Sequence, residues 1–116
     1  MIDLTRLVNQ AIGKTAIQEG ICTVYCPHTT AGLTINENAD PDVVHDILMK
    51  LNSLVPIHEG YQHLEGNADA HIKSTLVGQS VQLVISRGKL QLGTWQGIYF
   101  CEFDGPRHRN IWIQIT

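Results

Sequence analysis

The stretch Ser80-Val81-Gln82-Leu83-Val84-Ile85-Ser86 decides the fold class, because Val81, Leu83 and Ile85 recur at every second position. A period of two is the spacing of side chains on one face of a strand. Short turn sequences then separate three further apolar runs, so the last third of the chain predicts successive strands. These runs are Leu90–Leu92, Ile98–Phe103 and Ile111–Ile115.

Before this stretch the apolar spacing is mostly helical. Three helix starts are indicated by capping residues: Asp3, Asp40 followed by Pro41, and Asn67, with Gly78 ending the third helix. The second helix has an apolar stripe from Val43 to Leu54, which we expect to face the core. Two strands are expected between the first two helices, at Ile21–Tyr25 and Gly32–Ile35.

Helices in the first two thirds and short-linked strands in the last third favour an α+β fold. With 116 residues the chain is long enough for one core. We therefore expect a single domain, residues 1–116, with a largely antiparallel β-sheet and two to three helices.

The composition excludes several classes of protein. With 43% hydrophobic residues, 16% charged residues and a net charge of -3, the chain is typical of soluble globular proteins, not of nucleic-acid-binding ones. No apolar run is long enough to span a membrane, and no signal segment opens the chain, so a cytoplasmic protein is expected. Among the three cysteines, Cys22 and Cys101 are expected in the core, while Cys26 precedes Pro27-His28 and is a candidate to line a site.

Coordinating side chains are dense between His63 and His71, where two imidazoles, two carboxylates and an amide fall within nine residues. His28 follows a strand, in a turn that also contains two threonines. Three imidazoles would leave an open position on a divalent ion such as zinc, so we predict a metal site of His28, His63 and His71. The alternatives are a solvated polar loop with a helix cap, and a turn histidine.

A second group of residues indicates anion binding. Arg107 and Arg109 are two positions apart, and in extended chain their guanidinium groups would suit one phosphate. The alternative is that they pair with Glu102 or Asp104. Trp95 offers an indole that could stack on a ring-bearing ligand or pack between subunits. Glu37, at a strand end, is a candidate general acid or base.

Six motifs occur in an order that resembles the YjbQ family, and together they span nearly the whole chain. They are Pro27–Gly32, Ile35–Asn38, Asp40–Asp42, His63–Ser74, Gly93–Gln96 and Asp104–Arg109. The resemblance implies a homotrimeric α+β protein and secondary thiamine-phosphate synthase activity, in which a pyrimidine pyrophosphate and a thiazole phosphate are joined with release of pyrophosphate. It also implies that an N-terminal strand of the family is missing from residues 1–116.

On this resemblance the candidate residues take provisional roles. Catalysis is assigned to Glu37, Lys73 and Arg107, substrate binding to Asn67, Trp95, Arg107 and Arg109, and metal binding to His28, His63 and His71. The expected cofactor is a divalent metal ion with no organic group, and the expected partner is a phosphorylated small molecule, with no nucleic acid and no membrane. Two alternatives stay open: a metal-dependent phosphoester hydrolase, and a non-catalytic metal- or metabolite-binding trimer.

Overall fold

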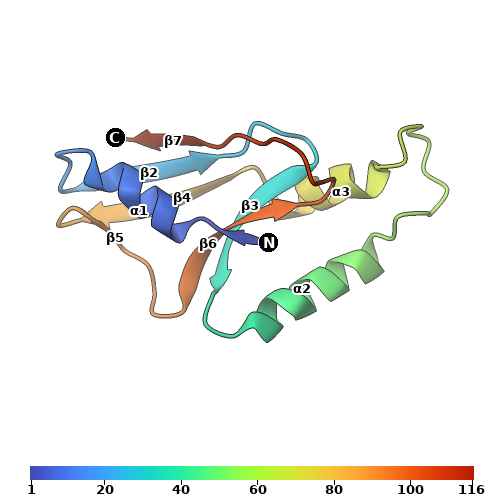
Figure 1. Ribbon diagram of the computed structural model, residues 1–116, viewed down its shortest axis with the longest axis horizontal. Helices are drawn as coiled ribbons and strands as arrows, with labels where there is room; N and C mark the ends of the chain where they lie inside the picture. Colours follow the sequence, from blue (N-terminus) through green and yellow to red (C-terminus); the bar gives the residue numbers. More distant parts are fainter.

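Two antiparallel sheets and three helices make up the computed structural model, which describes residues 1–116 (Figure 1). The α+β class expected from the sequence is confirmed. Strands β1, β6 and β3 form one sheet, and β5, β4, β2 and β7 form the other. In chain order the elements are β1 (Ile2–Asp3), α1 (Thr5–Gly13), β2 (Gly20–Tyr25), β3 (Ala31–Glu37), α2 (Pro41–Leu54), α3 (Ala68–Val77), β4 (Ser80–Ser86), β5 (Lys89–Leu90), β6 (Gln96–Glu102) and β7 (Trp112–Ile115).

Side chains from both sheets and from α1 form one buried cluster. Alternate residues of β2, β3, β4 and β6 enter it, as the period of two predicts, and α1 adds Val8 and Ile12 from one face. Burial of this apolar surface is the main stabilising term of the fold. The cluster consists of Val8, Ile12, Cys22, Val24, Cys26, Ala31, Leu33, Leu83, Ile85, Ile98 and Phe100.

The chain start differs from the prediction. Ile2 and Asp3 form a short strand, with Ile2 opposite Phe100 of β6. Helix α1 begins at Thr5, whose backbone N–H donates to Oδ1 of Asp3 at 2.9 Å. Asp3 thus organises the turn into the helix from two positions before it. Two residues are too few to display a strand period, which is why the pattern missed β1.

Helix α2 has the predicted start but not the predicted environment. Asp40 caps it by accepting the backbone N–H of Asp42 at 2.9 Å, and Pro41 occupies the first turn. None of its residues is buried, however, and Met49 and Leu54 are more than half exposed. The expectation that its apolar stripe faces the core is therefore met only in part by a single chain, because Val43, Val44, Ile47, Leu48 and Leu51 are partly buried and none is fully covered.

Helix α3 is held against the start of β3. A Cβ on Gly32 would come within 2.6 Å of the carbonyl oxygen of Gly78, just past the helix end, so only glycine permits this approach. The same carbonyl accepts the N–H of Leu33 at 3.0 Å, and the buried hydroxyl of Ser74 donates to the carbonyl of Ala31 at 2.6 Å. These contacts fix α3 beside the loop that follows β2.

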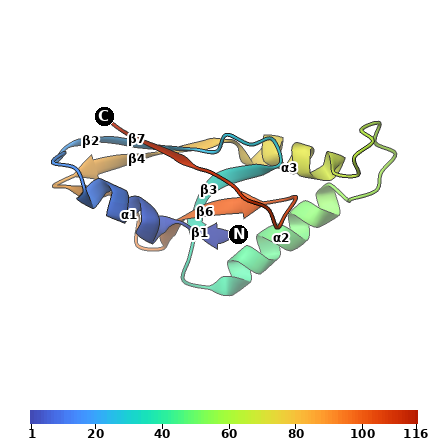
Figure 2. The same ribbon diagram turned by 45° about the horizontal axis from the view of Figure 1, so that its top comes forward.

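The single chain is elongated, with extents of 50 × 27 × 20 Å and a radius of gyration of 15.5 Å. A compact domain of this length would have a radius of gyration of about 13 Å. Figure 2 shows the reason: α2 and the loop that joins it to α3 stand apart from the two sheets. No helix combines the length and the apolar character needed to cross a membrane.

Candidate functional site

His28 and His71 line one cavity of about 540 Å³, although they come from different elements. Pro27 ends the run of β2, which leaves His28 in the following loop, and His71 lies on α3. Because α3 is fixed beside that loop, the two imidazoles share the cavity. The lining residues are Tyr25, Cys26, Pro27, His28, Thr29, His71, Ser74, Thr75, Gln79 and Trp112.

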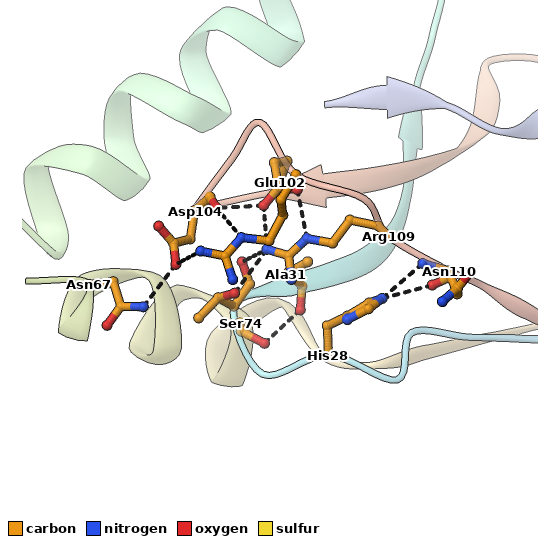
Figure 3. A network of polar contacts seen from close by, with 10 residues as sticks. His28, Ala31, Asn67, Ser74, Glu102, Asp104, Arg109 and Asn110 are labelled. Carbon is orange, nitrogen blue, oxygen red and sulfur yellow. Dashed lines mark hydrogen bonds and ion pairs between the residues drawn. The ribbon is translucent and has the colours of Figure 1, made fainter. Parts of the chain in front are cut away.

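The ring of His28 has one nitrogen occupied by the chain itself. Its Nε2 lies 2.9 Å from the backbone nitrogen of Asn110 and 3.2 Å from the carbonyl oxygen of that residue (Figure 3). When Nε2 carries no proton it accepts the N–H of Asn110, and when it carries one it donates to the carbonyl oxygen of Asn110. The tautomer of the ring decides which of the two hydrogen bonds forms. In either case Nδ1 is the ring nitrogen left for a ligand.

His63 approaches His71 from the loop that precedes α3. Their ring centroids are 5.2 Å apart and the planes meet at 82°. Two imidazoles on one tetrahedral ion would have ring centres roughly 5 Å apart, since each nitrogen lies about 2.1 Å from the metal. The pair therefore has a spacing that suits two ligands of one ion.

The predicted site of three histidines is not formed within one chain. No group of three histidine, cysteine, aspartate or glutamate side chains lies close enough together to hold a metal ion. His63 and His71 come together, whereas the Nε2 atom of His28 is engaged by Asn110. The sequence spacing could not reveal this backbone contact, because Asn110 is 82 residues away.

Arg109 is paired with Glu102 instead of facing an open phosphate position. Its Nε donates to Oε1 of Glu102 at 2.7 Å, and its Nη2 donates to Oγ1 of Thr30 at 2.9 Å. The hydrogen bond from Arg109 lowers the pKa of Glu102, and the same pairing raises the pKa of Arg109. Only 11% of the Arg109 side chain is exposed, so this pair ties the end of β6 to the start of β3.

Asn67 contacts a second carboxylate, that of Asp104 (Figure 3), and Arg107 binds the same carboxylate. Oδ2 of Asp104 accepts from Nδ2 of Asn67 and from Nη2 of Arg107, both at 2.8 Å. Asn67 stands at the start of α3 as predicted, but its side chain does not cap the helix. Its Oδ1 is buried without a hydrogen-bond partner. The shared phosphate site of Arg107 and Arg109 stays a prediction, since each arginine here has its own carboxylate.

Lys73 lies away from the histidine cavity. Its Nζ is 3.0 Å from Oδ2 of Asp69, one turn earlier on α3, and donates to Oδ1 of Asn52 on α2 at 2.8 Å. Both charged side chains are more than nine-tenths buried. Lys73 thus joins α3 to α2, and it lines a separate cavity of about 480 Å³ beside His58.

Glu37 and Trp95 lie at the opposite end of β3. Glu37 is the last residue of that strand and is opposite Gln96, the neighbour of Trp95. Seven strand residues span roughly 20 Å, which separates this end from His28. The single chain thus distributes the candidate residues over several places. His28 and His71 line one cavity, with His63 beside His71, and Arg107 and Arg109 line a second cavity of about 240 Å³.

Tyr25, Gln79 and Trp112 line the cavity but were missed in the sequence. Tyr25 and Trp112 are opposite each other on β2 and β7, and they fall outside the buried alternating positions of their strands. The sequence signal that could have identified Tyr25 and Trp112 is a large aromatic residue on the outer face of a strand. Gln79 gave none, because a polar residue after a helix end is common in loops.

Cys26 lines the cavity as the sequence suggested, and all three cysteines are free and buried. Burial raises the pKa of the Cys26 thiol, and it raises that of Cys101 to about 11. A thiol held protonated at neutral pH is a poor nucleophile. Cys26 therefore lines the cavity but does not supply a reactive thiolate.

These features belong to an α+β domain with a histidine-lined cavity between a helix and a strand end. The sequence model of a family described as "UPF0047 protein YjbQ-like" matches residues 1–116. The chain belongs to this family.

Relatives support this membership along the whole chain. The UPF0047 protein YugU of Bacillus subtilis is 54% identical, over 99% of this chain and 88% of that protein. A UPF0047 protein of Methanocaldococcus jannaschii is also 54% identical, over 99% of this chain and 83% of its own length. The crystal structure of a YjbQ/UPF0047 family protein from Clostridium acetobutylicum has a TM-score of 0.97 and 56% identity, covering 99% of this chain and 89% of that one.

Proposed function

We propose that the protein is an enzyme that joins two small phosphorylated molecules with release of pyrophosphate, as a thiamine-phosphate synthase does. One observation carries the proposal: His28 and His71, singled out separately in the sequence, line one cavity of about 540 Å³. That volume suits a small-molecule substrate. The polar lining includes Thr29, whose hydroxyl suits a phosphorylated ligand.

In this proposal the histidines handle protons and orient the substrate. His28 is held through Nε2, so its Nδ1 is positioned to exchange a proton with a bound group. Positive charge for the pyrophosphate would come from Arg107, which is half-exposed and keeps guanidinium donors beyond its two bonds to Asp104.

We further propose that a divalent ion binds His63 and His71, whose ring spacing suits two ligands of one ion. Such an ion, when bound, would stabilise negative charge on a phosphate oxygen. Titration of the purified protein with Zn²⁺ in a calorimeter tests this without any turnover. His63→Ala and His71→Ala should each remove the binding, and His45→Ala, on the exposed surface of α2, should not.

We also propose that the protein works as a cytoplasmic homotrimer. The number three and the location come from the family resemblance and from the unpaired cysteines. Self-association is supported by the incompletely buried stripe of α2 and by the elongated single chain. A neighbouring copy would also be the means of bringing Glu37 toward a histidine cavity. Light scattering should give three times the chain mass, and Leu54→Asp should lower it while Lys50→Glu does not.

A turnover assay separates the proposed enzyme from its alternatives. The protein would be given the pyrimidine pyrophosphate and the thiazole phosphate, and both pyrophosphate and inorganic phosphate would be measured. We expect pyrophosphate release that falls about 100-fold or more in His28→Ala and His71→Ala, because such groups contribute roughly 10²–10⁴ to rates. His45→Ala is the matched control. Release of inorganic phosphate alone would indicate a hydrolase, and binding without any release would indicate a binding protein.

A further inference from the structure

An aromatic pair forms one wall of the histidine cavity. Tyr25 and Trp112 face each other across β2 and β7, with ring centroids 5.5 Å apart and planes inclined at 31°. Both side chains are open to solvent, at 42% for Tyr25 and 61% for Trp112. Exposed aromatic faces beside a polar cavity are suited to stacking on another flat ring.

Gln79 presents a hydrogen-bond acceptor in the same cavity, and the chain fixes its orientation. The hydroxyl of Ser74 donates its only proton to the carbonyl of Ala31, so it can only accept from Gln79. The carbonyl of Ser74 is also an acceptor. The Nε2 atom of Gln79 must therefore face Ser74, at 2.7 Å from Oγ and 3.3 Å from the carbonyl oxygen. Oε1 is left without a partner in the chain and is not buried.

We propose that this cavity binds a nitrogen heteroaromatic ring that carries an amino group. The ring stacks on Tyr25 and Trp112, and the amino group donates to Oε1 of Gln79. The inference rests on the proposed function, and it names the class of one substrate. The cavity is larger than one ring, which leaves room near His28 and His71 for the group attached to it.

This assignment replaces Trp95 as the stacking residue. Trp95 is exposed to the same extent as Trp112, at 61%, but it lies at the far end of β3 and does not line the cavity. The chain has two tryptophans, so each can be studied alone. Trp95→Phe leaves Trp112 as the only tryptophan, and Trp112→Phe leaves Trp95.

The test uses 4-aminopyrimidine as the probe and tryptophan fluorescence as the signal, with unsubstituted pyrimidine for comparison. In Trp95→Phe the probe should quench the fluorescence in a saturable way, and in Trp112→Phe it should not. Trp112→Ala should weaken probe binding about tenfold by calorimetry, the loss expected for one stacking partner. Gln79→Met should remove most of the preference for 4-aminopyrimidine over pyrimidine, while Trp95→Ala should leave both affinities unchanged.

Three outcomes would overturn the inference. The first is saturable quenching of Trp95 and not of Trp112, and the second is a Gln79→Met variant that still prefers the amino compound. The third is a Trp112→Ala variant whose mass by light scattering changes while its probe affinity does not, which would make the pair an interface between copies. The assay needs no turnover, so a protein that binds the ring but releases no pyrophosphate would contradict the proposed function alone.

Discussion

Helices α2 and α3 differ in the kind of residue that they carry and in how deeply those residues are buried. α2 has an apolar stripe and a well-formed cap, yet none of its residues is buried. α3 has four buried residues, of which Asp69, Lys73 and Ser74 are polar. Apolar periodicity therefore predicted where a helix forms but not whether anything covers it. In this fold specific polar contacts hold α3 in place, while the more apolar α2 has no fully buried residue and contacts α3 through the bond of Lys73 to Asn52.

The largest expected effect is on the buried pair of α3. Lys73→Ala would leave the carboxylate of Asp69 buried without its cation, which should lower the free energy of unfolding by about 3–5 kcal/mol. Lys50→Ala, at an exposed position of α2, should change it by less than about 0.5 kcal/mol. Urea unfolding measures both.

A double variant sharpens this prediction. Replacing the pair by apolar residues, as in Asp69→Leu with Lys73→Met, should restore most of the loss because no charge is then left alone. If Lys73→Ala lowered the free energy of unfolding no more than Lys50→Ala, polar contacts would not distinguish α3 from α2.

The next effect concerns a single hydroxyl. Ser74→Ala would leave the buried carbonyl of Ala31 without a donor and free the amide of Gln79, so the free energy of unfolding should fall by about 1–3 kcal/mol. Ser53→Ala on α2 is the matched control, since Ser53 is exposed. Equal midpoints in urea for the two variants would mean that the contact of α3 with β3 is not a source of stability.

The fold was predictable where a local period is strong enough. Helix α1 and the strands from β2 to β7 appear close to the expected positions, because their side chains alternate or recur within one element. The division into two sheets and the short strand β1 depend on residues far apart in the chain, such as Ile2 and Phe100. No window of local sequence carries that information.

The site was predictable in part for the same reason. His28 and His71 could be selected by residue type, and their approach depends on the tight contact of Gly32 with Gly78. The residues that the sequence patterns did not reveal are contact partners far away in the chain, such as Asn110 for His28 and Trp112 for Tyr25. Sequence patterns name candidate groups well, but strand length and register decide which of them meet.

A smaller effect is expected at the start of α2. Asp40→Ala removes the bond to the N–H of Asp42 and should destabilise the first turn by about 1 kcal/mol. Because α2 packs on little, we expect the loss as faster hydrogen exchange of its own amides, by about fivefold, with α3 unchanged. Asp40→Asn should retain most of the protection. Exchange that rises equally in both helices would show that α2 unfolds only with the whole domain.

The smallest effect is a dependence on pH at Glu102, whose pair with Arg109 lies beside the contact of α3 with β3. Its pKa is lowered in the folded state, so its contribution to stability is fully present above the unfolded value of about 4.3 and is lost as the pH falls through the folded pKa. The difference in free energy of unfolding between wild type and Glu102→Gln should shrink from pH 6 toward pH 3. A constant difference would contradict the assignment of the pair.

The register of the sheets has a consequence for how quickly the chain can fold. β1 pairs with β6, and β2 pairs with both β4 and β7, so most strand pairings join segments far apart in sequence. Only β4 and β5 form a hairpin between adjacent strands. Long loops must close before these pairings contribute, which slows folding to milliseconds or seconds in comparable domains. On the ribosome, β2 can pair with β7 only after Trp112–Ile115 have emerged, so β7 is the last strand to join the second sheet.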